Sequence, residues 1–209
     1  MRLRTTLLPL IVLVCCALPV QAGQSILFLG DSLTAGLGVE PEEAYPHLLG
    51  QLLAADGFEV RIINGGQSGS TTASALGRLN WYARAKPDIL FLALGANDGL
   101  RGLTIEEMGK NLDAVIAAAQ ARGMRVLLAG MELPPNYGAE YTDAFRRLYA
   151  ELAERYQIPL LPFLLAGVGG VAALNQADGI HPNAEGHQRI ARHVLPFLKA
   201  HLQPPPAKP

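Results

Sequence analysis

Five short apolar runs recur along the chain, and a segment with helical spacing follows each of them. The runs are Ile26–Leu29, Val60–Ile63, Ile89–Leu94, Val126–Ala129 and Leu160–Phe163. Apolar residues follow one another in these runs almost without alternation, which is typical of parallel strands covered on both faces. We therefore expect five buried strands in one parallel sheet.

The segments between the runs place apolar residues at helical spacing. We expect helices over Tyr45–Ala55, Thr71–Tyr82, Thr104–Gly123, Thr142–Tyr156 and Asn183–Leu202. Thr104 and Glu107 match a capping box, and Pro196 is expected to bend the last helix. Alternating strands and helices predict one doubly wound α/β domain with right-handed crossovers.

The amino terminus departs from this pattern. Arg2 and Arg4 precede an apolar run over residues 7–18, and Val20-Gln21-Ala22 then supplies small residues. This is the build of a signal peptide over residues 1–22, cleaved after Ala22. A retained anchor is the alternative, but about 12 apolar residues fall short of the roughly 20 that span a bilayer. We expect a mature domain over 23–202, a flexible tail over 203–209, and a periplasmic or secreted protein without a stable membrane anchor.

Composition excludes several classes of function. The formal net charge is −1 and no cluster of lysine and arginine appears, so nucleic acid is not an expected partner. Cys15 and Cys16 leave with the signal, so the mature chain has no disulfide and no thiolate metal site. Gly36-Leu37-Gly38 lacks the third glycine of a dinucleotide fingerprint, and no phosphate-loop lysine occurs. We predict no metal and no cofactor.

A serine, an aspartate and a histidine occur where hydrolytic chemistry can use them. Ser32 follows the first apolar run, and therefore the carboxyl end of a strand, where open α/β sheets bind ligands. Asp178 and His181 are three residues apart, so one turn can direct the carboxylate at the imidazole. The chain order Ser…Asp…His is one of those in which serine hydrolases build a triad. The alternative is structural: Gly30-Asp31-Ser32 as a capped turn, and His181-Pro182 as a helix start.

Two further loops follow strands at the same predicted edge. Asn64–Ser70 is rich in glycine and serine, so its backbone N–H groups can approach a ligand closely. Gly95–Gly99 offers the side-chain amide of Asn97. Each segment alone is also a common turn sequence. Their shared position beside Ser32 predicts donors for an oxyanion.

These motifs resemble the four sequence blocks of the SGNH (GDSL) hydrolases, named for serine, glycine, asparagine and histidine. The likeness covers nearly all of the mature chain and extends to the bacterial thioesterases, lysophospholipases and arylesterases of that family. The segments that carry it are Gly30–Gly36, Gly95–Gly102, Leu133–Gly138 and Asp178–Asn183. The resemblance implies a flavodoxin-like three-layer α/β/α sandwich with a five-stranded parallel sheet, in agreement with the apolar pattern.

The resemblance also implies a role for each matching residue. Ser32 is expected to be the nucleophile, with its own backbone N–H in the oxyanion hole. Gly69 is expected to supply a second N–H and Asn97 a side-chain amide. His181 is expected to act as general base and then general acid, oriented by Asp178.

Three positions leave the resemblance incomplete. Gly66 competes with Gly69 for the glycine role, and Gly69 is preferred because it occupies the Ser-Gly step that the family shows after the strand. Ser70 stands where the family group usually has an acidic residue. Ala96 replaces a glycine before Asn97, which is expected to restrict the loop slightly.

The expected function is hydrolysis of small-molecule acyl esters and thioesters, such as aryl esters, acyl-CoA thioesters and lysophospholipids, through an acyl-enzyme, by a monomeric enzyme. An acyl groove is expected at the apolar, glycine-rich segment 164–171, bordered by 100–103 and 131–137, although 164–171 also fits a buried connector. One alternative is a carbohydrate O-acetyl esterase, which needs stacking aromatics, whereas the one tryptophan, Trp81, falls on a predicted helix. A non-catalytic lipid carrier is the third hypothesis.

Overall fold

The computed structural model describes residues 23–205, so the predicted signal peptide and the end of the predicted tail lie outside the described residues. Its centre is a five-stranded, fully parallel sheet with the strand order β2-β1-β3-β4-β5. This order is that of flavodoxin-like folds, so the predicted fold class is confirmed. The strands are β1 (Gln24–Gly30), β2 (Val60–Gly66), β3 (Ile89–Ala93), β4 (Arg125–Ala129) and β5 (Leu160–Leu161).

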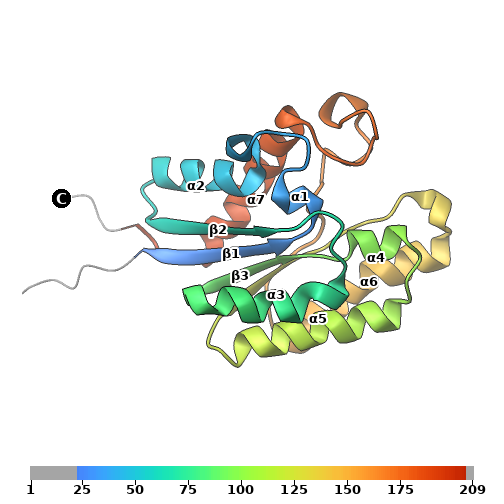
Figure 1. The fold of residues 1–209 in the computed structure, drawn as a ribbon, viewed down its shortest axis with the longest axis horizontal. Helices are drawn as coiled ribbons and strands as arrows, with labels where there is room; N and C mark the ends of the chain where they lie inside the picture. The colour runs from blue at the N-terminus through green and yellow to red at the C-terminus, as the bar shows by residue number, and fades with distance from the viewer. Residues whose placement is uncertain (1–22, 206–209) are drawn as a thin grey trace, which may run out of the picture.

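Helices cover both faces of the sheet and complete three layers (Figure 1). One face carries α2 (Tyr45–Ala55) and α7 (Ala184–His201), which pack on each other. The opposite face carries α3 (Ala75–Tyr82), α5 (Ile105–Gln120) and α6 (Ala139–Tyr156). Two short helices, α1 (Ser32–Ala35) and α4 (Ala96–Leu100), directly follow the ends of β1 and β3.

The core lies on both sides of the central strands. Every residue of β3 is buried, and so are Ile26 to Gly30 of β1. Phe28 and Phe91 meet across the two strands with ring centroids 5.0 Å apart. Burial of apolar side chains on both faces explains the continuous apolar runs in the sequence, because a strand covered twice has no solvent-facing side.

The register of the sheet brings the ends of three strands to one level. Gly30, the last residue of β1, is paired with Gly66 of β2 on one side and with Ala93 of β3 on the other. The loops that follow these strands therefore leave the sheet side by side. Ligand sites of open parallel sheets lie at this carboxyl edge.

Local structure departs from the sequence prediction in several places. β5 ends at Leu161 and not at Phe163, because Pro162 has no N–H with which to continue the ladder. The predicted helix 71–82 is divided into a 3-10 turn over Thr72–Ser74 and α3. The segment treated as a turn around Asn97 is the helix α4. The helix that contains Pro196, α7, continues through it to His201.

Candidate active site

Ser32 is the first residue of α1, and a single residue, Asp31, separates it from the end of β1. The Asp31 side chain caps this helix, since its Oδ1 accepts a hydrogen bond from the Leu33 N–H at 3.0 Å. The structural alternative considered for this segment, a capped turn, thus describes the local backbone correctly. It does not conflict with a chemical role, because the cap fixes where the Ser32 hydroxyl points.

Close packing of β2 against α1 holds the serine in place. A Cβ at Gly66 would meet the backbone of Ala35, so only glycine fits where β2 ends. Asn64 ties the same two elements together, because its amide donates to the Thr34 carbonyl at 3.0 Å. The short helix that carries Ser32 is therefore fixed on the sheet edge by neighbours from a different strand.

Asp178 and His181 form a local unit in the loop before α7. Asp178 Oδ2 lies 2.7 Å from His181 Nδ1, and Asp178 Oδ1 accepts from the N–H groups of Ile180 and His181 at 3.0 Å each. These hydrogen bonds, led by that of the His181 backbone, lower the pKa of Asp178 to about 2. The carboxylate is therefore charged at neutral pH and holds one nitrogen of the ring.

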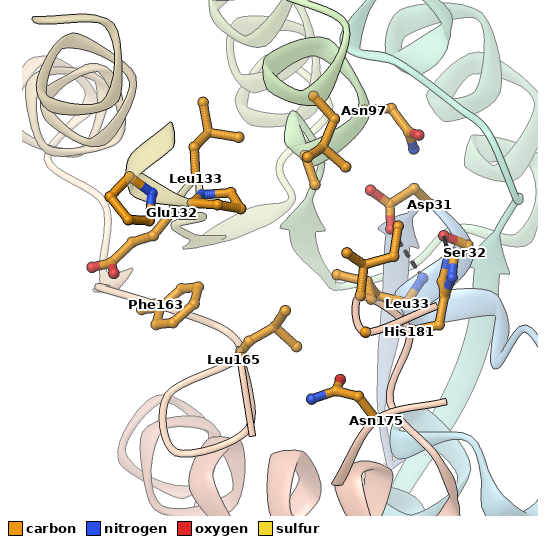
Figure 2. Close-up of a pocket in the computed structure, with 18 residues that line it drawn as sticks. Asp31, Ser32, Leu33, Asn97, Glu132, Leu133, Phe163, Leu165, Asn175 and His181 are labelled. Atoms are coloured by element: carbon orange, nitrogen blue, oxygen red, sulfur yellow. Dashed lines mark hydrogen bonds between the residues drawn. The ribbon is translucent and has the colours of Figure 1, made fainter. Parts of the chain in front are cut away.

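The other nitrogen of the ring faces the serine. Ser32 Oγ lies 2.9 Å from His181 Nε2, although the two residues are 149 positions apart in the sequence. Figure 2 shows the imidazole directed at the Ser32 hydroxyl at the side of the pocket where Asp31 also lies. The structure thus brings Ser32, His181 and Asp178 into one continuous hydrogen-bonded chain.

Gln176, which the sequence analysis did not single out, ties the histidine loop to the serine loop. Its Nε2 donates to the Leu37 carbonyl at 2.6 Å and to the Pro182 carbonyl at 2.9 Å, and its N–H donates to the His181 carbonyl at 2.7 Å. Leu37 follows α1, so these bonds connect the loop after α1 to the loop before α7. No spacing pattern predicts the link to the serine loop, because Leu37 is 139 residues away from Gln176.

Asn97 lies on α4 and faces the same pocket as Ser32. Its Nδ2 donates one hydrogen bond to the Ser70 carbonyl at 3.0 Å, which orients the amide and leaves its second hydrogen for another acceptor. The preceding Gly95 has a φ of 121°, and a Cβ there would collide with the Tyr149 hydroxyl. A glycine is therefore required immediately before this helix.

The neighbour of Asn97 anchors the helix. The Asp98 carboxylate is buried and accepts from the Thr72 N–H at 2.9 Å and from the Thr72 hydroxyl at 2.5 Å. Asn111 of α5 donates to the same hydroxyl at 3.1 Å. These bonds join α4 to the loop after β2, and they explain why a sequence that favours turns forms a helix here.

The two candidate glycines differ in what their N–H groups do. The Gly66 N–H donates to Asn64 Oδ1 at 2.9 Å and is therefore occupied. Gly69 has a φ of 77°, and within residues 23–205 its N–H has no acceptor. Arg101 donates to the Gly69 carbonyl at 3.1 Å, which steadies the loop. Ser70 stands where the resemblance leads one to expect an acidic residue. It is buried, and its hydroxyl lacks a hydrogen-bond partner within residues 23–205.

Asp31 is the second carboxyl group beside the serine. Its side chain is 1% exposed, and its Oδ2 has no hydrogen-bond partner within the described part of the chain. Burial raises the pKa of Asp31 from 3.8 to about 6, against smaller lowering effects of the backbone and of His181 and Arg78. Asp31 is thus mostly ionised at neutral pH despite its burial.

A pocket of about 380 Å³ opens beside the serine and is lined mostly by apolar side chains. Ser32, His181 and Asn97 lie at one side of it, and Glu132, Leu133 and Phe163 lie at the opposite side (Figure 2). Apart from the His181 imidazole, Phe163 has the one aromatic ring among the residues that line this pocket. The full lining is Asp31, Ser32, Leu33, Ala96, Asn97, Leu100, Glu132, Leu133, Pro134, Pro135, Phe163, Leu165, Gly169, Gly170, Asn175, Gly179, Ile180 and His181.

The segment 164–171 contributes both to the pocket and to the core. Leu165, Gly169 and Gly170 line the pocket, whereas Leu164 and Val168 are fully buried in the core. Trp81 lies away from the pocket on α3, where it is 62% exposed. The aromatic stacking surface that a carbohydrate esterase needs is therefore not built from this tryptophan.

Residues 23–205 contain no cluster of three or more histidine, cysteine, aspartate or glutamate side chains arranged to hold a metal ion. Over the same range, the helices are all too short or too polar to cross a bilayer.

Most of this chain matches one protein family. Residues 28–189 match the GDSL-like Lipase/Acylhydrolase family, a span that contains Ser32, Asn97 and His181. The chain belongs to this family. It is accordingly a hydrolase of ester bonds.

Individual relatives agree with the family match. The chain is 42% identical to the esterase TesA of Pseudomonas aeruginosa over 85% of this chain and 89% of the relative. It is 39% identical to an arylesterase of Vibrio mimicus over 94% and 98% of the two chains. It is 33% identical to the thioesterase 1/protease 1/lysophospholipase L1 of Escherichia coli over 94% and 92%. A crystal structure of TesA superposes with a TM-score of 0.83, covering 86% of this chain and 100% of that one at 42% identity.

Proposed function

We propose that this GDSL-like acylhydrolase is an exported serine esterase that cleaves acyl esters and thioesters through a covalent acyl-enzyme. The observation that carries the proposal is the contact of Ser32 Oγ with His181 Nε2 at 2.9 Å, continued by His181 Nδ1 and Asp178 Oδ2 at 2.7 Å. A serine hydroxyl is a weak nucleophile until a base takes its proton, and this chain of contacts supplies that base.

In the first half of the reaction, Ser32 Oγ attacks the acyl carbonyl carbon while its proton moves to His181 Nε2. Asp178 stabilises the imidazolium that forms. The negative oxygen of the tetrahedral intermediate is held by the N–H groups of Ser32 and Gly69 and by the Asn97 amide. The C–O or C–S bond then breaks, and the leaving alcohol or thiol takes the proton from His181.

The second half repeats these steps with water. His181 removes a proton from a water molecule as its oxygen attacks the acyl-Ser32 carbonyl. The same three donors hold the second oxyanion, whose collapse releases the carboxylic acid and returns the proton to Ser32. Apart from the substrate and this water molecule, every group used in the two halves belongs to the chain.

The substrate class follows from the pocket and from the relatives. An apolar lining beside the nucleophile favours an acyl chain over a sugar, and polar groups are confined to a few positions such as Asn97, Asn175 and Glu132. The relatives named arylesterase and thioesterase 1/protease 1/lysophospholipase L1 support aryl esters, thioesters and lysophospholipids as candidate substrates.

Hydrolysis of p-nitrophenyl esters from acetyl to palmitoyl, beside an acyl thioester, tests this proposal. We expect turnover across several chain lengths and on the thioester, with Ser32→Ala inactive on all of them. Activity confined to the acetyl ester would favour a carbohydrate O-acetyl esterase. Equal, near-zero rates for wild type and Ser32→Ala would favour a lipid carrier.

Export is proposed from the basic, apolar and small-residue segments of residues 1–22. Expression of the full chain in a Gram-negative host, with analysis of the cell fractions, tests it. We expect a protein that begins at Gly23 in the periplasm or medium and behaves as a monomer. A protein that retains Arg2 and Arg4 and pellets with the membranes would contradict this.

A further inference from the structure

The Asp31 carboxylate has a feature that its structural role does not require. Capping of α1 uses only Oδ1, which accepts the Leu33 N–H at 3.0 Å. Asparagine or serine provides an equally good capping oxygen without a charge. The second oxygen, Oδ2, is buried without a hydrogen-bond partner within residues 23–205. The charge of Asp31 therefore needs an explanation other than the cap.

Burial of this charge is unfavourable to the fold. The unfolded chain would ionise Asp31 around pH 3.8, whereas burial raises its pKa to about 6 in the folded protein. Between these values the folded protein holds the proton more tightly, so this group lowers stability as pH rises through the interval. A group that the fold holds at a disadvantage, in a pocket beside a reactive serine, is a candidate for a functional role.

The charged and titratable groups around Asp31 come from four elements. His181 from the loop before α7 and Arg78 from α3 both interact favourably with the carboxylate. Tyr45 of α2 and Tyr149 of α6 interact electrostatically with it, but burial raises the pKa of each phenol, so both stay neutral. Arg78 Nη2 donates to the carbonyls of Gly30 and Gly65, whereas its Nη1 is buried without a partner within residues 23–205, and its positive charge is the same throughout the reaction. His181 is thus the neighbour whose charge changes during the reaction.

We propose that Asp31 is a positioning residue of the ester hydrolysis, a second carboxylate whose negative charge stabilises the His181 imidazolium formed when Ser32 attacks. The inference rests on the proposed acyl-enzyme function. Asp178 acts on the ring by a direct hydrogen bond, with a side chain that is 45% exposed and so partly screened by water. Asp31 acts through space from a buried position, where screening is weaker.

The pH dependence of one rate ratio tests the proposal. The ratio of kcat/KM for wild type over Asp31→Asn is measured on an aryl ester from pH 5 to pH 8. Below pH 6 Asp31 is protonated and asparagine imitates it, so we expect a ratio near one. Above pH 6 the wild type gains its charge, and the ratio should rise to about tenfold, the size expected for a buried charge that is weakly screened by water.

A purely structural role gives a different curve. Loss of the cap or of packing lowers the rate equally at both pH values, so a flat ratio above one would overturn the proposal, as would a ratio of one throughout. Asp56→Asn is the matched control, because this exposed carboxylate pairs with Lys199 away from the site; its ratio should stay near one. Asp31→Ser, which retains a capping oxygen without a charge, repeats the test should the asparagine variant fold poorly.

Thermal unfolding provides a readout that does not depend on catalysis. The difference in Tm between Asp31→Asn and wild type should grow by about 5 °C from pH 4.5 to pH 7.5, because only the wild type must ionise a buried carboxyl group. His187 acts in the opposite direction, since burial lowers its pKa to about 4, but it is present in both proteins and cancels in the difference.

Failure of this inference can be distinguished from failure of the proposed function. If wild type hydrolyses no ester, or if Ser32→Ala remains active, the acyl-enzyme function fails. If wild type is active through Ser32 and the rate ratio is flat, only the role of Asp31 fails.

Discussion

The two loops that meet at the active site hold their carboxylates in opposite environments. Asp178 lies in an open loop, accepts hydrogen bonds from Ile180 and His181, and has its pKa lowered to about 2. Asp31 lies beneath the serine, keeps one oxygen without a partner in the described residues, and has its pKa raised to about 6. Local hydrogen bonding determines the first value and burial determines the second. The pKa of each carboxylate at this site is therefore determined by its surroundings.

The largest effect is expected from breaking the contact between the two loops. His181→Ala leaves Ser32 without a base, and we expect kcat/KM to fall by about 10⁴ or more. The Tm should stay nearly unchanged, because the ring lies at the pocket surface and contributes little to the core. Hydrolysis of an aryl ester and thermal unfolding measure the two quantities. His47→Ala, at an exposed position of α2, is the control and should keep full activity.

Exchange of the exposed carboxylate for an amide should have the next largest effect. In Asp178→Asn the amide donates to His181 Nδ1, which places the ring proton on Nε2 and removes the acceptor for the Ser32 hydroxyl. We expect a loss of about 10³ in kcat, somewhat below the effect of a fully buried triad aspartate. Asp143→Asn on α6 is the matched control. A loss as small as that of Asp31→Asn would show that direct contact with the ring does not distinguish the two carboxylates.

Asn97→Ala should remove one oxyanion donor. The expected loss is about a hundredfold in kcat, or about 3 kcal/mol of transition-state stabilisation, with little change in KM. Steady-state kinetics on a short-chain aryl ester measure both. Asn80→Ala is the control, because this asparagine is exposed and pairs with Arg122 far from the pocket. A change in KM alone would mean that Asn97 binds substrate and not the oxyanion.

The smallest effect is expected from loosening the two loops without touching the reacting groups. Gln176→Ala removes the bonds to the Leu37 and Pro182 carbonyls and should lower kcat by about threefold to tenfold, because the serine and the histidine are held less precisely. Gln51→Ala on α2 is the control. An unchanged kcat would show that the loops keep their alignment through the remaining contacts alone.

The sequence predicted the local and periodic features of this molecule. The five apolar runs indicated the strands, and the three-residue spacing of Asp178 and His181 indicated the carboxylate–imidazole pair. The placement of Ser32 followed from the strand before it. Each of these inferences uses neighbours in the sequence, where spacing carries the information.

The features that the sequence did not predict depend on partners far along the chain. Gln176 bonds to Leu37, and Asp98 bonds to Thr72 and so makes a helix of a turn-like segment. The burial that sets the pKa of Asp31 also comes from packing of several elements, and no local pattern distinguishes this aspartate from an ordinary cap. Long-range packing decides such features, so they become visible only in the folded structure.

The central claim, that Ser32 carries the acyl group between the two half-reactions, is tested most directly by intact-mass and peptide mass spectrometry. Wild type and Ser32→Ala are each treated with an alkyl fluorophosphonate and, in rapid quench, with an activated aryl ester. We predict one adduct of the expected mass on the peptide that contains Ser32 in the wild type and none in the variant. An adduct on another residue, or ester turnover by Ser32→Ala at the wild-type rate, would contradict the mechanism.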